Sequence, residues 1–305
     1  MIKQRIKILF AISIILISFS PLFGQIPENY YASIKGKKGA ELKTALFEII
    51  KDPQVISYSK IWTAFESTDA QRRDRVWDMY SMNAAGKADY YFAFKSNRCG
   101  RYKKEGDCYN REHSVPRSWF YDKYPMNCDL FHIYPTDGYI NNRRGNLPLG
   151  EVGITYWIST NGSKVGQNTT GEFTSTVFEP IDDFKGDFAR TYFYMATAYE
   201  DKIPSWQSEQ IGGETYPGFT KWSLDMLLRW HKEDPVSLKE VRRNEAVYKI
   251  QKNRNPFIDY PQLVEYVWGE NTQKAFNNEK TMDSYLKVEY SPFERFLNKV
   301  FGYMR

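Results

Sequence analysis

The abundance of aromatic side chains is the feature that most constrains how this chain can fold. The 305 residues include 23 Tyr, 20 Phe and 8 Trp, which together make up 17% of the sequence. A buried aromatic side chain removes roughly 150–250 Å² from water, so this many rings favour a large common core. No repeat, low-complexity block or long Gly/Ser/Pro linker divides the chain. We therefore predict one large domain in the mature protein.

The charge balance excludes several classes of protein and identifies none by itself. The chain has 42 Lys and Arg and 37 Asp and Glu, a formal net charge of +5. Hydrophobic residues make up 42% and charged residues 26%, which excludes a disordered, collagen-like or wholly membrane-embedded chain. A mildly basic average does not by itself indicate nucleic-acid binding.

The first 24 residues have the pattern of a secretory signal peptide. Lys3, Arg5 and Lys7 precede an almost wholly apolar stretch over residues 8–19, and small or turn-forming residues follow as far as Gly24. The apolar stretch is shorter than the ~20 residues that span a bilayer, so an uncleaved anchor is the weaker alternative. We expect cleavage near residue 24, and a secreted or periplasmic monomer without membrane attachment.

Three cysteines, Cys99, Cys108 and Cys128, lie within 30 residues of this presumed exported chain. One disulfide and one remaining thiol are the natural expectation for an oxidising compartment. A zinc site is the weaker alternative, because no CxxC pair is present. The spacing leaves all three disulfide pairings open.

Periodicity predicts a mixed α+β chain. Helical spacing appears over residues 41–50, 61–66, 188–199, 222–230 and 237–251, and strand-like alternation over residues 75–80 and 89–94. Residues 99–125 are polar, basic and interrupted by Pro, as expected of an irregular active-site region. Residues 270–305 read as a polar tail of unknown role with a terminal helix over residues 292–301.

Two polar clusters hold the residues best suited to catalysis. In the first, Glu112 and His113 are adjacent and Arg111 and Arg117 flank them, which combines a metal ligand, a proton acceptor and phosphate-binding charge. Neighbouring side chains of a strand point to opposite faces, so Glu112 and His113 can serve one site only where the strand ends or bends. The competing interpretation is a surface histidine in a polar loop.

The second cluster spans residues 129–146. Asp137 can cap a short helix through residues 141–144, and asparagine is a poor helix former, so Asn141 and Asn142 need a reason to be there. An amide oxygen is a hard neutral ligand suited to Mg²⁺ or Ca²⁺. The alternative is that these asparagines only complete a turn.

Together the two clusters resemble the secreted and periplasmic endonuclease I nucleases, members of the ββα-metal or His-Me finger group. The matching blocks occur in the family's order over roughly 165 residues, which makes coincidence implausible. They are residues 111–116 (REHSVP), 129–130 (DL), 140–141 (IN), 178–180 (FEP), 185–187 (KGD), 189–195 (ARTYFYM), 234–237 (DPVS), 243–244 (RN) and 251–259 (QKNRNPFID). The resemblance implies a single α+β domain over residues 25–269, built around a ββα-metal finger with additional helices.

The resemblance also implies a mechanism. Glu112 and Asn141 would bind one Mg²⁺, with Mn²⁺ or Ca²⁺ as alternatives, and His113 would be the general base that takes a proton from the attacking water. Charge on the phosphate and the departing 3′ oxygen would be neutralised by the ion, and the products would carry 5′-phosphate ends. The substrate would be DNA, with RNA as a further candidate, cut with little sequence specificity.

Other residues are assigned supporting roles with explicit alternatives. We expect His132 to steer the site, with a buried structural role as the alternative, and Arg144 to bind the phosphate, with packing against Asp129 as the alternative. We predict His231 to be a surface residue. Predicted nucleic-acid contacts are Arg111, Arg117, Arg143, Arg190, Arg243, Asn253 and Arg254. The alternative for Arg190 is a buried ion pair with Glu179 or Asp187, and for Arg243, Asn253 and Arg254 it is a solvated helix face.

Two basic stretches contrast with the low average charge. Residues 95–117 contain seven basic and three acidic residues, and residues 237–254 contain six basic and two acidic residues, so each has a net charge of +4. Such stretches fit a nucleic-acid track. Two rival functions remain: a phosphodiesterase that acts on a smaller substrate, and a noncatalytic exported DNA-binding protein.

Overall fold

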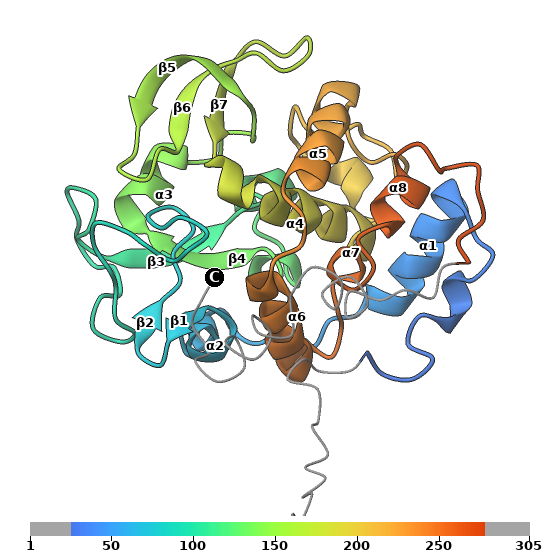
Figure 1. Ribbon diagram of the computed structural model, residues 1–305, viewed down its shortest axis with the longest axis horizontal. Coiled ribbons are helices and arrows are strands. Elements are labelled where there is room, and N and C mark those ends of the chain that lie inside the picture. The colour runs from blue at the N-terminus through green and yellow to red at the C-terminus, as the bar shows by residue number, and fades with distance from the viewer. Residues whose placement is uncertain (1–25, 278–305) are drawn as a thin grey trace, which may run out of the picture.

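The computed structural model describes residues 26–277, which form a mixed α+β fold (Figure 1). Short 3₁₀ turns connect several of the regular elements. The helices are α1 (Gly39–Ile50), α2 (Ile61–Thr68), α3 (Gly138–Arg144), α4 (Lys185–Ala198), α5 (Lys221–Glu233), α6 (Leu238–Gln251), α7 (Pro256–Asp259) and α8 (Leu263–Val267). The strands are β1 (Ala70–Arg72), β2 (Arg75–Val76), β3 (Tyr109–His113), β4 (Ile133–Asp137), β5 (Val152–Ile158), β6 (Lys164–Asn168) and β7 (Thr176–Glu179).

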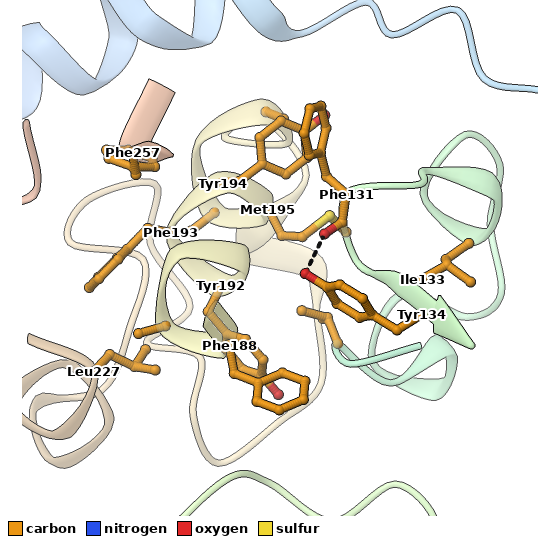
Figure 2. Packing of buried hydrophobic residues seen from close by; sticks show 14 of the residues in the cluster. Phe131, Ile133, Tyr134, Phe188, Tyr192, Phe193, Tyr194, Met195, Leu227 and Phe257 are labelled. Atoms are coloured by element: carbon orange, nitrogen blue, oxygen red, sulfur yellow. Dashed lines mark hydrogen bonds between the residues drawn. The ribbon is translucent and has the colours of Figure 1, made fainter. Parts of the chain in front are cut away.

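Helix α4 lies at the centre of the molecule, and every one of its residues is buried. Its aromatic side chains pack in several directions, as Figure 2 shows: Phe193 lies toward Phe257, whereas Tyr194 lies beside Phe131. The ring centroids of Phe131 and Tyr194 are 4.5 Å apart. The aromatic content therefore forms one extensive core, and the helix predicted over residues 188–199 is confirmed.

The strands form three small antiparallel sheets. β1 pairs with β2, β3 pairs with β4, and β5, β6 and β7 form a three-stranded sheet in that order. β4 leads directly into α3, so β3, β4 and α3 make two antiparallel strands followed by a helix.

The predicted strands over residues 75–80 and 89–94 are wrong in extent. Only Arg75–Val76 forms a strand there, although Val76 still donates a backbone hydrogen bond to Phe92. The aromatic alternation does not correspond to a strand here. After Val76 the chain enters the core, where a turn buries consecutive side chains. The backbone N–H of Tyr80 donates to the Asp78 carboxylate at 2.8 Å, which ends the extended conformation.

The described chain stays attached to the domain beyond residue 269. Phe276 is buried, its backbone N–H donates to Lys37, and its carbonyl accepts from Gly36. The predicted signal peptide over residues 1–24 and the predicted helix over residues 292–301 lie outside the described residues. Within residues 26–277, no helix has the length and apolar character needed to cross a bilayer.

Candidate active site

The unit formed by β3, β4 and α3 brings the two polar clusters together. In the strand register Glu112 lies opposite Tyr134 and His113 lies opposite Ile133. At the end of β4 the Asp137 carboxylate accepts from the backbone N–H groups of Tyr139 and Ile140, which is the helix cap expected from the sequence. The cap fixes where α3 begins, and therefore where its side chains lie relative to β3.

A disulfide supports the start of α3. Cys99 and Cys108 are bonded, and Cys128 is a buried free thiol, so the structure selects one of the three possible pairings. Gly138 donates its backbone N–H to the Cys108 carbonyl at 2.9 Å, and a Cβ at Gly138 would lie only 2.3 Å from Cys99 Sγ. The first residue of α3 must therefore be glycine for the helix to pack this closely against the disulfide.

Glu112, His113 and Asn141 line one open pocket of about 280 Å³. Glu112 and His113 share it although they are neighbours in the chain, because β3 ends at His113 and the backbone leaves the strand there. The structure thus meets the condition that the sequence set for a joint site. Arg111 and Arg117 also line the pocket.

The Glu112 carboxylate is 3% exposed and is held by two donors. Tyr80 Oη donates to Glu112 Oε1 at 2.8 Å, and Arg144 Nη1 donates to the same oxygen at 2.9 Å. Both hydrogen bonds fall on Oε1, and no side-chain donor within residues 26–277 contacts Oε2, which is therefore open to a cation. Burial raises the pKa of Glu112, and the charge of Arg144 opposes that rise.

Arg144 has a different place from the one predicted. It is 1% exposed and donates to Glu112, to the backbone carbonyl of His113 at 2.9 Å and to the carbonyl of Ser114. The alternative partner, Asp129, instead accepts from the hydroxyl groups of Tyr194 and Tyr199. A guanidinium enclosed in this way is not available to a phosphate, so we reassign Arg144 as a positioning residue that ties α3 to the end of β3.

The hydrogen bond of His113 defines its neutral form. His113 Nε2 lies 3.1 Å from the carbonyl oxygen of Asn127. A carbonyl oxygen only accepts, so Nε2 carries the proton and Nδ1 is the basic atom of the ring. Burial, followed by the neighbouring His132, holds the pKa of His113 well below its ordinary value. The imidazole is therefore neutral at neutral pH, as a general base must be.

The donor set suits a hard divalent cation. Glu112 offers one carboxylate oxygen, and the side-chain amide of the half-buried Asn141 has no hydrogen-bond partner among residues 26–277. In that part of the chain no group of three or more His, Cys, Asp or Glu residues could hold a metal. One carboxylate and one amide leave most of the coordination shell to water and substrate, which is the usual situation for Mg²⁺ and not for structural zinc.

His132 lies behind His113 and is fully buried. Its Nε2 lies 2.7 Å from the Met126 carbonyl oxygen, and its ring centroid is 5.2 Å from that of His113. Burial lowers the pKa of His132 to about 4, so this ring is also neutral. These contacts fit both the steering role predicted for His132 and its alternative, a buried structural role, since the ring packs against His113 and does not line the pocket.

The predicted nucleic-acid contacts divide into two groups. Arg111 and Arg117 border the pocket, and Arg143 is exposed on α3. The other four residues are buried and partnered, so they are corrected to structural roles because no substrate can reach them. Arg190 pairs with Glu240, Arg243 with Asp69, Arg254 with Asp259 and Glu245, and Asn253 with the Ile50 carbonyl and Tyr194.

His231, predicted at the surface, is also buried. It accepts at Nδ1 from Arg190 at 3.2 Å and donates from Nε2 to the Pro261 carbonyl at 3.1 Å. Helix α5 therefore turns this side chain inward, toward the ion pair of Arg190 and Glu240. The helical pattern of residues 222–230 gave no signal for it, because His231 follows the last predicted residue.

Three parts of the site escaped the sequence analysis. Tyr80 holds Glu112, Tyr58 stacks on His113 with ring centroids 5.9 Å apart, and the Asn127 carbonyl fixes the His113 tautomer. The first two lie at least 30 positions from the residues they contact, and the third is a backbone group. No local pattern identifies such partners.

The comparisons with known proteins agree with this geometry. Residues 38–262 match the family model described as Endonuclease I. The chain belongs to the endonuclease I family. Membership of this family makes it a hydrolytic nuclease, and the noncatalytic interpretation is set aside.

Relatives of this endonuclease I family member are named after different nucleic-acid substrates. It is 35% identical over 249 residues to the extracellular ribonuclease of Bacillus amyloliquefaciens, covering 79% of this chain and 78% of that protein. It is 28% identical over 139 residues to endonuclease-1 of Buchnera aphidicola subsp. Baizongia pistaciae, covering 45% and 49% of the two chains. It is 25% identical over 135 residues to the extracellular deoxyribonuclease of Aeromonas hydrophila, covering 44% and 50%.

Proposed function

We propose that this protein is an exported, metal-dependent endonuclease that hydrolyses phosphodiester bonds of RNA and DNA with little sequence specificity. The relative that matches over about four fifths of the chain is named a ribonuclease, and a shorter match is named a deoxyribonuclease. Both relatives are named extracellular, in keeping with the disulfide and the N-terminal signal pattern. RNA therefore ranks as a substrate beside DNA.

The observation that carries the proposal is the single pocket shared by Glu112, His113 and Asn141. His113, held by the Asn127 carbonyl, accepts a proton at Nδ1 from the water that attacks phosphorus. The attacking oxygen comes from water and not from the sugar, so a 2′-hydroxyl is not required. Activity on both sugars is therefore expected, and 5′-phosphate ends follow because the P–O bond to the 3′ oxygen breaks and that oxygen leaves with a proton.

Glu112 and Asn141 hold the divalent ion in this proposal, with Mg²⁺ as the first candidate and Mn²⁺ or Ca²⁺ as alternatives. When bound, the ion supplies neutralising charge for the phosphate and the departing oxygen. Arg144 keeps the Glu112 carboxylate and the end of β3 in place. The sequence β3, β4, α3 then serves as a ββα-metal finger, the arrangement that the endonuclease I resemblance implies.

The base is tested with supercoiled plasmid and a long single-stranded RNA, each incubated with the purified mature protein in Mg²⁺ or EDTA. Wild type should cut both substrates only with Mg²⁺, and His113→Ala should lose about 10²-fold or more in rate. His231→Gln is the control, because His231 lies outside the pocket. Equal rates for wild type and His113→Ala would reject the base, and hydrolysis of only a small phosphodiester would favour the rival substrate class.

The metal assignment is tested with two neighbouring asparagines. Asn141→Ala should raise the Mg²⁺ concentration that gives half-maximal activity by about tenfold or more. Asn142→Ala is the matched control, since Asn142 is exposed on the same helix and does not line the pocket. Mn²⁺ titration by calorimetry reports the same affinity without turnover. A larger effect on oligonucleotide affinity than on metal affinity would contradict the assignment.

A further inference from the structure

A second cavity lies at the far end of α2 from the active-site pocket. Its volume is about 560 Å³, compared with about 280 Å³ for the pocket. It is lined by residues at the end of α2, in the hairpin β1–β2, between positions 85 and 91 and on α6, and we call it the α2–α6 cavity. Five cationic residues and one acidic residue line it: Arg72, Arg75, Lys87, Lys239, Arg242 and Asp69.

The cationic charge of the α2–α6 cavity is only partly neutralised. Asp69, its one acidic residue, is committed to Arg243, whose Nε lies 2.8 Å away. Lys239 pairs with Asp187. Arg242 is exposed on α6, and neither it nor Lys87 forms an ion pair with any residue between 26 and 277. The cavity therefore offers a net positive field to an anionic ligand.

An aromatic ring supports one of these cations. The Arg75 guanidinium lies 3.8 Å from the ring centroid of Tyr91, and Tyr91 is 40% exposed. Stacking limits the mobility of the guanidinium while its N–H groups stay in the plane where phosphate oxygens bind. Cations combined with exposed aromatic rings are characteristic of surfaces that follow a nucleic-acid strand.

The α2–α6 cavity and the active-site pocket are connected along α2. Tyr58, just before this helix, lines the pocket, and Thr68, its last residue, lines the cavity. The eight residues of α2 span roughly 12 Å, which corresponds to about three to four nucleotides at the axial rise of a duplex strand. Lys95 and Arg98 both pair with Glu66 of α2, and Arg98 also lies over the ring of Trp62 on the same helix. Two cations thus share one carboxylate along α2.

We propose that the α2–α6 cavity is an exosite that binds the phosphate backbone of the substrate strand about four nucleotides from the scissile bond. The inference rests on the proposed nuclease function and adds a second point of attachment for long substrates. It assigns Arg75 and Arg242 to backbone binding, and it places them outside the chemistry at His113. A substrate too short to reach the cavity is cleaved without its help.

The experiment compares a 20-nucleotide and a 3-nucleotide substrate, each as RNA and as DNA, for the mature protein and Arg75→Ala/Arg242→Ala. The variant should lose about tenfold in kcat/KM on the long substrate and less than about twofold on the short one. The slope of log kcat/KM against log salt should fall by about two for the long substrate. Lys202→Ala/Lys221→Ala is the control, because it removes two cations outside the cavity, the half-buried Lys202 and the exposed Lys221.

Arg242→Glu serves as the second variant, since Arg242 is exposed and its replacement breaks no ion pair within residues 26–277. Equal effects on both substrate lengths, or none on either, would overturn the exosite. If wild type cleaves neither substrate, the proposed function fails, and the exosite is then decided by fluorescence anisotropy of the 20-mer in EDTA. Weaker binding by Arg242→Glu supports the exosite in that case, and unchanged binding rejects it.

Discussion

The guanidinium of Arg144 lies between α3 and the end of β3, where it contacts groups from both. It donates to the Glu112 carboxylate and to two successive backbone carbonyls, those of His113 and Ser114. Tyr192 Oη also donates to the Ser114 carbonyl, at 2.8 Å. Arg144 thereby links Glu112, the proposed metal ligand, to the backbone of His113, the proposed base.

Lysine cannot reproduce these contacts, because one ammonium group replaces a planar fork of donors. Arg144→Lys should lower the free energy of unfolding by about 1–3 kcal/mol, since buried acceptors lose their donors. It should also lower nuclease activity, because Glu112 and the end of β3 are no longer fixed. Urea unfolding and cleavage rates measure the two effects. The control is Arg143→Lys on the same helix, where the exposed Arg143 has Tyr139 and Trp157 as its contacts within residues 26–277. An equal loss of stability in this control would contradict the assignment.

At the scale of single residues, the sequence predicted the side chains that line the pocket and missed those that hold them. Glu112, His113 and Asn141 fall in short patterns whose chemistry is evident from residue type. The role of Arg144 depends instead on which residues α3 packs against, and that packing is not encoded locally. The same holds for Arg190 and Arg243, whose partners lie 50 or more positions away in the chain.

At the scale of elements, α3 depends on the segment that contains the disulfide. Gly138 donates to the Cys108 carbonyl, and Gly106 donates to the Asp137 carboxylate that caps the helix. In the chain-entropy account, a disulfide across 9 positions contributes about 2.5 kcal/mol. Cys99→Ser/Cys108→Ser should therefore unfold at lower urea and cleave more slowly, because Asn141 lies on α3. Dithiothreitol should lower the stability of wild type to urea and leave that of the variant unchanged. If reduction does not change the stability of wild type, the disulfide does not support α3 in this way.

Helices were easier to predict than strands, because helix signals are local and strand pairing joins segments that are distant in the chain. Helix α6 begins just after Ser237, which forms a capping box with Glu240, so its start is encoded within four residues. The strands are short, and their partners are distant in the chain: residues 109–113 pair with residues 133–137. Alternation alone could not separate such pairing from the turn at Asp78, where neighbouring side chains are buried on both sides.

At the scale of the whole molecule, the two basic stretches differ in how far their cations are exposed to solvent. Much of the stretch over residues 95–117 stays at the surface and includes Arg111 and Arg117 at the pocket. In the stretch over residues 237–254, Arg243 and Arg254 are buried in ion pairs, whereas Arg242 remains exposed. A charge count along the sequence therefore overstated the basic surface, because it could not distinguish solvated cations from those that organise the core.

All three histidines are buried, which makes stability depend on pH in a definite direction. Burial lowers the pKa of His113 well below its ordinary value, that of His132 to about 4 and that of His231 to about 3. Each ring binds a proton in the unfolded chain near pH 6.5 but stays neutral in the folded protein. Their contribution to stability is therefore complete above pH 6.5 and is lost as the pH falls toward the folded-state values.

The contribution of His231 can be isolated with glutamine. Its amide can accept from Arg190 and donate to the Pro261 carbonyl, as the neutral imidazole does, but it binds no proton. His231→Gln and wild type should have similar unfolding free energies at pH 7.5, and the variant should gain about 2–3 kcal/mol relative to wild type by pH 4.5. Urea unfolding across this range measures the difference. The buried carboxylates Asp187 and Asp234 titrate in both proteins, so they largely cancel in this comparison. Parallel curves would show that the His231 ring is protonated in the folded state.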